Sequence, residues 1–234
     1  MKRKSVSIII AVYNEANTLE KEVRKLHELI LSKIPNSEII IAEDGSTDGS
    51  KIIIERLVNE LGVIHSTSIK RKGYTKALRD AFKLAKAPLI FFSDTGNKHD
   101  PKDFWKLYEH INDFDLIIGV KSNRKDQLYR QILTWGYNKL LSIIFKIKIK
   151  DSDSGFRIYN KKLMNKLLSK NWIFKELVAS ELYLRSNLEG FKIKEVPVSY
   201  YQRTGASKGL PIKKIPKVIF NIFFDIYRLK NSYK

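Results

Sequence analysis

Four short apolar segments alternate with amphipathic segments in the N-terminal part of the chain, and this alternation restricts the fold more than any other sequence feature. The segments, which we predict to be strands, are residues 6–12, 38–42, 63–66 and 89–92, of which 63–66 is the least apolar. After the first of them, residues 14–32 have helical spacing, with Leu19, Val23, Leu26 and Ile30 on one face. Short strands that alternate with helices are typical of a doubly wound, mainly parallel sheet. The sequence therefore predicts an α/β fold.

Polar side chains follow three of these predicted strands. Tyr13 and Glu15 follow the first strand, Asp44 follows the second, and Asp94 follows the strand at residues 89–92. Ligands of open α/β sheets bind outside the carboxyl ends of the strands, so we expect these side chains to meet in one crevice. Each acidic residue alone is also explained by the preference of carboxylates for helix N-termini. The coincidence of three such positions favours a binding site.

Glycine-rich phosphate-binding motifs do not occur at these strand ends. The first strand is not followed by G-x-G-x-x-G, and the chain contains no G-x-x-x-x-G-K-[ST]. A bound nucleotide would therefore be held by side chains.

The C-terminal half has a different pattern. We expect a strand at residues 116–120, a basic amphipathic helix at 127–147, mostly helix at 163–188, a strand at 191–201 and a helix from Ile215 onward. These elements fit one catalytic domain over residues 1–210 and a basic amphipathic helix over 211–234. No segment approaches the roughly 20 apolar residues of a membrane-spanning helix.

The net charge of +19, from 44 basic and 25 acidic residues, indicates a polyanionic partner. Nucleic acid, an anionic membrane surface and phosphorylated substrates all fit this charge. We expect no nucleic acid, because the chain lacks an aromatic RNA-binding signature and a base-reading basic helix. The absence of cysteine excludes disulfides and thiolate metal sites. The apolar run at the N-terminus has no small-residue cleavage site and predicts a strand, so we expect a cytoplasmic protein.

Seven motifs in this order resemble those of family 2 glycosyltransferases, and most closely the dolichol-phosphate mannose synthase and polyprenyl-phosphate glycosyltransferase branch. They are AVYNEANTL, EDGSTDGS, RKGYTKAL, FFSDTGNKHDP, DSDSGFR, EVPV and RTGASKG. The resemblance covers about residues 6–208. It implies a GT-A fold, which is Rossmann-like with a mainly parallel central sheet, here with a C-terminal amphipathic helical extension. It also implies the inverting transfer of one sugar from a nucleotide-sugar to a lipid phosphate.

The resemblance implies a role for each matched residue. The nucleotide-sugar would be contacted by Ala11, Tyr13, Glu15, Asp44, Lys72, Asp94, Thr95, Gly96, Arg203 and Lys208. The acceptor phosphate would be received by Lys121, Arg130 and Ser207. The catalytic residues would be Asp94, Lys98 and Arg203. The element formed by Asp151, Ser154, Gly155 and Phe156 resembles the family element beside the acceptor. For the lysines and arginines, the alternative is ordinary solvated surface charge.

The metal site is where the chain departs from the family. The resemblance implies a divalent cation, magnesium or manganese, with Asp94 as a ligand, but Gly96 and Lys98 replace the other two usual ligands. Asp94 and the substrate diphosphate can hold the cation, with Asp100 as an outer carboxylate. Alternatively, the Lys98 ammonium replaces the cation as the counter-charge, assisted by Arg203 and Lys208. A third alternative is a site that no longer catalyses.

A lipid-phosphate acceptor explains the charge of the chain. A phosphate monoester is anionic near neutral pH and needs no general base, unlike a sugar hydroxyl. The basic amphipathic segments 127–147 and 215–230 would lie on an anionic membrane surface, and packing on the core is their alternative role. We expect a peripheral protein on the cytoplasmic face, anchored by itself or by a membrane partner.

Two other functions fit parts of the sequence. One is a family 2 transferase that acts on a glycan hydroxyl, against which the RTGASKG loop and the absence of Q-x-x-R-W argue. The other is a non-catalytic subunit of a membrane complex, suggested by Gly96 and Lys98.

Overall fold

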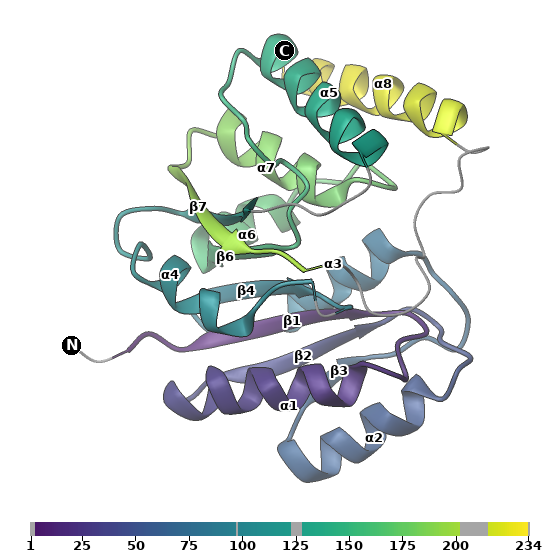
Figure 1. Ribbon diagram of the computed structural model, residues 1–234, viewed down its shortest axis with the longest axis vertical. Helices are drawn as coiled ribbons and strands as arrows, with labels where there is room; N and C mark the ends of the chain where they lie inside the picture. The colour runs from purple at the N-terminus through teal and green to yellow at the C-terminus, as the bar shows by residue number, and fades with distance from the viewer. Residues whose placement is uncertain (1–2, 97, 123–127, 202–214, 234) are drawn as a thin grey trace.

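The computed structural model describes residues 3–96, 98–122, 128–201 and 215–233. These residues form a seven-stranded sheet in the order β3-β2-β1-β4-β6-β5-β7, with helices on both faces (Figure 1). The strands are β1 (Val6–Val12), β2 (Glu38–Glu43), β3 (Ile64–Ser66), β4 (Leu89–Asp94), β5 (Leu116–Ser122), β6 (Phe156–Asn160) and β7 (Ile193–Ser199). The α-helices are α1 (Leu19–Leu29), α2 (Ser50–Leu61), α3 (Tyr74–Leu84), α4 (Phe104–Tyr108), α5 (Leu128–Phe145), α6 (Lys161–Leu168), α7 (Val178–Leu188) and α8 (Ile215–Asn231). Short 3-10 helices occupy Leu31–Lys33 and Pro101–Asp103.

The sheet is mainly parallel, as the alternation of strands and helices predicted. β1 pairs in parallel with β2 on one side and β4 on the other. β6 is the exception, because it runs antiparallel between β4 and β5. The parallel pairing of β2, β1 and β4 brings their carboxyl ends to the same edge of the sheet.

The sheet separates two apolar layers. Alternate residues of β1 point to opposite faces, so Ile8 and Ile10 belong to one layer and Ile9 belongs to the other. The first layer contains the apolar faces of α1, α2 and α4, and the second contains those of α3, α6 and α7. Since β1 is covered on both faces, its sequence is an almost uninterrupted apolar run.

Helices α5 and α8 form a third layer, which packs against α7. Leu141 of α5, Leu184 of α7 and both Ile226 and Leu229 of α8 share one buried cluster. Figure 1 shows α5 and α8 together at one end of the molecule. Within the described part of the chain, no helix is both long enough and apolar enough to cross a bilayer. The predicted domain boundary at residue 210 lies outside the described residues.

The prediction of a mostly helical segment at 163–188 was only partly correct. Residues 169–177 interrupt it and form a loop between α6 and α7. The loop is held from behind by Glu181, whose carboxylate accepts the backbone N–H groups of Ile173 and Phe174 and pairs with Arg185 at 2.7 Å. Glu181 and Arg185 are 0% and 3% exposed. A buried ion pair fixes this loop. The spacing of apolar residues in the sequence gives no indication of such a pair.

The segment after β1 also differs from the prediction of helix over residues 14–32. Helix α1 begins only at Leu19. Before it, Asn14 has a positive φ of 55°, and its side-chain oxygen accepts the Thr47 backbone N–H. The polar residues after β1 are therefore tied to the loop after β2.

Candidate active site

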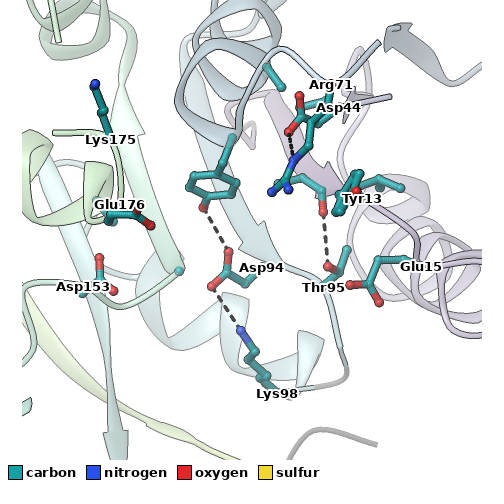
Figure 2. A pocket seen from close by; sticks show the side chains of 17 residues that line it. Tyr13, Glu15, Asp44, Arg71, Asp94, Thr95, Lys98, Asp153, Lys175 and Glu176 are labelled. Carbon is teal, nitrogen blue, oxygen red and sulfur yellow. Dashed lines mark hydrogen bonds and ion pairs between the residues drawn. The ribbon is translucent and has the colours of Figure 1, made fainter. Parts of the chain in front are cut away.

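A cavity of about 500 Å³ opens at the carboxyl ends of β1, β2 and β4. Figure 2 shows its lining side chains arranged around Asp94. The charged and polar residues among them are Tyr13, Glu15, Asp44, Arg71, Tyr74, Asp94, Thr95, Lys98, Asp153, Lys175 and Glu176. The residues that follow the three predicted strands therefore meet at one site, because their strands are parallel neighbours.

One end of the cavity combines an aromatic ring with charged groups. The Arg71 guanidinium lies 4.1 Å from the centre of the Tyr13 ring, and its Nε atom is 3.4 Å from Asp44 Oδ2. The other oxygen of Asp44 accepts the backbone N–H groups of Lys72 and Gly73 at 2.9 and 2.8 Å. A flat ring and guanidinium beside a carboxylate offer stacking and hydrogen bonds, which suit a nucleobase and its ribose.

Lys72 is placed differently from the nucleotide contact expected for it. Its ammonium group donates to Asp80 at 2.8 Å, and its side chain does not line the cavity. The preceding residue, Arg71, points into the cavity instead. The sequence KRKGY contains three basic residues, and no local pattern tells which one faces the ligand.

Asp94 lies at the centre of the cavity as the last residue of β4. Its Oδ1 atom accepts the Tyr74 hydroxyl at 3.3 Å, and its Oδ2 atom is 3.6 Å from Lys98 Nζ. Burial acts to raise the pKa of Asp94, but the neighbouring charges, Lys98 foremost, outweigh it and lower the pKa. A Cβ atom on Gly155 would lie 2.2 Å from the Asp94 carboxyl group. Glycine at 155 therefore leaves the space that Asp94 occupies.

The loop after Asp94 is anchored on both sides. Thr95 donates through Oγ1 to the Ala11 carbonyl at 3.2 Å, and the Gly96 N–H donates to Glu22 at 2.7 Å. His99 contacts the Ser199 carbonyl through Nδ1 at 3.3 Å. Burial lowers the pKa of His99 to about 4, so its ring is neutral at physiological pH. Of the predicted nucleotide contacts here, Ala11 and Thr95 line the cavity and Gly96 does not.

The opposite wall carries Asp153, Lys175 and Glu176, which Figure 2 shows across Asp94 from Tyr13 and Arg71. Burial raises the pKa of Asp153 to about 7, although Lys121 and Arg157 oppose the shift. The loop bearing Lys175 also touches α8, because its backbone hydrogen-bonds to the Asp225 carboxyl group. Sequence reasoning missed all three wall residues. The element DSDSGF has two aspartates, and only the folded loop shows that Asp153 lines the cavity.

Asp151 lies behind this wall and pairs with the predicted acceptor residue Lys121. Lys121 Nζ is 3.4 Å from Asp151 Oδ2 and 5.3 Å from the centre of the Tyr200 ring. Asp151 is only 3% exposed. Ser154 and Phe156 of the same element are structural: Ser154 donates to the Gly119 carbonyl at 2.6 Å, and Phe156 packs in the core.

The remaining predicted residues are outside the cavity or outside the described residues. Arg130 is in the first turn of α5, where its Nε atom donates to the Tyr129 hydroxyl at 3.1 Å. Asp100 caps the Pro101–Asp103 helix by accepting the Lys102 N–H and does not line the cavity. Arg203, Ser207 and Lys208 lie outside the described residues. The roles of these residues stay predictions.

Residues 7–168 match the family model for glycosyl transferase family 2. The chain belongs to this family. The predicted family is confirmed.

Two curated relatives and one solved structure show how far this family 2 transferase resembles known proteins. It is 28% identical over 210 residues to glycosyltransferase AglD of Haloferax volcanii, covering 83% of this chain and only 33% of AglD. It is 24% identical over 234 residues to dodecaprenyl-phosphate galacturonate synthase of Rhizobium johnstonii, covering 96% and 68% of the two chains. Its fold matches glucosyl-3-phosphoglycerate synthase from Mycobacterium tuberculosis with a TM-score of 0.72 and 16% identity, over 95% of this chain and 78% of that one. The match to this solved structure confirms the predicted GT-A fold.

Among the residues that the structure describes in this family 2 transferase, the side chains that could ligate a metal ion do not fit a centre built from several carboxylates. The synthase from M. tuberculosis was solved with Mn²⁺, uridine diphosphate and phosphoglyceric acid. In the described part of the present chain, no three His, Asp or Glu residues are grouped to hold a metal. Asp94 is the acidic residue at the centre of the cavity, and the Lys98 ammonium faces one of its oxygens.

Proposed function

We propose that this transferase moves one hexose from a nucleotide-sugar to a polyprenyl phosphate, dolichyl or undecaprenyl, with inversion at the anomeric carbon. The observation that carries the proposal is the single cavity in which a Tyr13–Arg71 stack lies beside the Asp94–Lys98 pair. The similarity to a dodecaprenyl-phosphate galacturonate synthase supports a lipid-phosphate acceptor.

The nucleotide would bind where the ring and the carboxylate are adjacent. Tyr13 and Arg71 supply planar groups for the base, and Asp44 and Glu15 supply acceptors for base or ribose hydrogen bonds. The diphosphate would then lie toward Asp94 and Lys98, and the sugar would face Asp153, Lys175 and Glu176. This order follows the cavity from one wall to the other in Figure 2.

The reaction would be a direct displacement. An oxygen of the acceptor phosphate forms the bond to the anomeric carbon, while the bond from that carbon to the diphosphate oxygen breaks. The nucleoside diphosphate leaves with the electron pair, and no proton has to be removed from the anionic acceptor. The protein positions two anions and stabilises the departing charge. We assign acceptor binding to Lys121 and Arg130, with Ser207, and assign diphosphate binding to Lys98, Arg203 and Lys208.

The surface of α5 and α8 would reach the lipid. Both helices expose large apolar side chains in addition to those that pack on α7: Leu128, Tyr129, Ile132, Leu133, Trp135, Ile143, Ile219, Phe220, Phe223, Phe224 and Tyr227. Helix α5 contains no acidic residue, and α8 contains one, Asp225. Apolar residues with basic neighbours suit the headgroup region of an anionic leaflet. We therefore propose peripheral attachment to the cytoplasmic face of a membrane, with a protein anchor as the alternative.

The test is transfer of radiolabel from a panel of nucleotide-sugars to undecaprenyl and dolichyl phosphate. We expect the label in a lipid product, and we expect mild acid hydrolysis of that product to release the labelled free sugar. Glycan acceptors without a phosphate serve as the control. If label appears only on the glycans, the lipid-phosphate acceptor is wrong.

One observation favours transfer to a glycan hydroxyl as a second candidate. A hydroxyl acceptor needs a general base, and Asp153 is a cavity carboxyl group whose pKa is raised to about 7. The variant Asp153→Asn separates the candidates. For a phosphate acceptor we expect less than about a tenfold loss of kcat, whereas loss of a required general base costs about 100-fold or more.

A further inference from the structure

We propose that the Lys98 ammonium group occupies the role of the divalent cation in this transferase, so that the leaving diphosphate is stabilised without a metal. This inference rests on the proposed nucleotide-sugar site, and it specifies how that site balances the charge of its ligand.

The first support is the position of Lys98. Its Nζ atom lies 3.6 Å from Asp94 Oδ2, and both residues line the cavity. The side chains of Lys98 and Asp94 are 27% and 25% exposed, so a ligand in the cavity can reach both. Figure 2 shows the Lys98 side chain directed toward Asp94. A cation bound to this oxygen of Asp94 would face the ammonium group and be repelled by it.

The second support is that the Lys98 backbone is fixed. The Lys98 carbonyl accepts the Tyr201 N–H at 2.8 Å, and the next residue, His99, forms an antiparallel bridge with Tyr200. These contacts join the loop after β4 to the end of β7. The ammonium group therefore projects from a held backbone, which lowers the cost of placing it against a phosphate.

The third support is the conformation of Gly96, which stands where the family has a second carboxylate. Gly96 has a φ of 98°, a backbone angle that residues other than glycine rarely adopt. Its N–H group donates to Glu22 Oε1 at 2.7 Å, which holds this conformation. The loop is thus built for a residue without a side chain, and a second aspartate would be strained there.

The charges balance in this arrangement. Two carboxylates and one divalent cation, the set that the family resemblance implies, sum to zero before the diphosphate arrives. Asp94 and Lys98, one negative and one positive, also sum to zero. The loss of one carboxylate and the replacement of a dication by an ammonium therefore leave the same net charge for the ligand to meet. An ammonium group is a compact, strongly hydrated charge that can hydrogen-bond to phosphate oxygens.

The experiment is calorimetric titration of the full chain with UDP, GDP, dTDP, CDP and ADP, in EDTA and then with MgCl₂ or MnCl₂. We expect one of these nucleotides to bind in EDTA with a Kd within about threefold of the value in metal. Lys98→Gln should weaken that binding about tenfold or more in EDTA, because a charged hydrogen-bond donor is lost. Lys98→Arg should retain binding within a few-fold.

Lys102→Gln is the matched control, because it removes the same charge from an exposed position outside the cavity. Binding that requires Mg²⁺ or Mn²⁺ in the unchanged protein overturns the inference but leaves the proposed transferase reaction standing. A Lys98→Gln variant that binds the nucleotide as tightly as the Lys102→Gln control also overturns the inference and leaves the proposed reaction standing. Metal-free binding without transfer to a lipid supports the inference and rejects the acceptor. Absence of binding by every nucleotide overturns both.

Discussion

The cavity at the sheet edge and the α5–α8 layer use apolar residues in opposite ways. In β1, β2 and β4 the apolar side chains are buried, and the polar residues that follow the strands form the cavity. In α5 and α8 one set of apolar side chains packs on α7, while a second set, including Trp135 and Phe220, is exposed at 69% and 73%. Polar groups are thus concentrated in the first region and apolar groups are displayed in the second. We propose that this difference separates a site that binds anionic substrates from a surface that contacts a lipid.

The largest expected effect tests the cavity alone. Asp94→Asn should lower kcat about 100- to 1,000-fold, because the carboxylate that positions Tyr74 and Lys98 is lost. Steady-state transfer to the lipid acceptor measures this, and the exposed Asp113→Asn is the control. Vesicle binding should be unchanged. If Asp94→Asn released the protein from vesicles, the two regions would not be separable.

The second prediction concerns the exposed apolar surface of α8 and leaves the cavity unchanged. Phe220→Glu combined with Phe224→Glu should weaken binding to phosphatidylglycerol-containing vesicles about 100-fold, since each phenyl ring contributes roughly 1.5 kcal/mol or more when buried. Vesicle sedimentation measures the effect. Nucleotide binding should remain within twofold, because neither residue lines the cavity. Equal binding of the double variant and the unchanged chain would show that this face does not contact lipid.

Within the cavity, two adjacent basic residues provide a sharper contrast. Arg71→Ala should weaken nucleotide binding about tenfold, since the guanidinium stacked on Tyr13 is removed. Lys72→Ala should change the Kd less than twofold, because the Lys72 ammonium pairs with Asp80. Calorimetry on both variants decides between them. The reverse order of effects would restore the contact first expected for Lys72.

The smallest effect concerns the pH dependence of stability. The pKa of Asp153 is raised to about 7 in the folded protein from an ordinary value of 3.8, so the folded state binds the additional proton between these values. Its contribution to stability is complete at low pH and is lost as the pH rises from about 4 to 7. Asp153→Asn should remove this loss, which we place at about 1 kcal/mol, less than the full pKa shift would give, because Asp153 is only half-buried and lines an open cavity. Urea unfolding at pH 5 and pH 8 measures it, and an unaltered pH slope in the variant would contradict it.

Much of the fold was predictable because its signals are local. The β-branched run at residues 6–12 predicted β1 with the observed bounds, and the spacing of Leu19, Val23 and Leu26 predicted the buried face of α1. The polar residues after the strands were predictable as a group, because parallel pairing alone brings their strand ends together.

The remainder depends on contacts between distant residues. The loop at 169–177 is fixed by Glu181 and Arg185, and its exposed Lys175 and Glu176 carry no sequence pattern that marks a cavity wall. The choice between Arg71 and Lys72 was set by Asp80, which lies on a different element and captures the Lys72 ammonium. For the α5 and α8 helices, apolar spacing predicted amphipathic character, but both helices are apolar on the packed side and on the exposed side.

The buried Glu181–Arg185 pair has a consequence for how this transferase can acquire a new substrate. It holds the 169–177 loop from the side away from the cavity, by backbone N–H groups and not by the side chains that line it. Lys175 and Glu176 can therefore be exchanged without disturbing their support. Because we propose that this wall faces the sugar, libraries at these two positions are the place to begin redesigning which sugar is transferred.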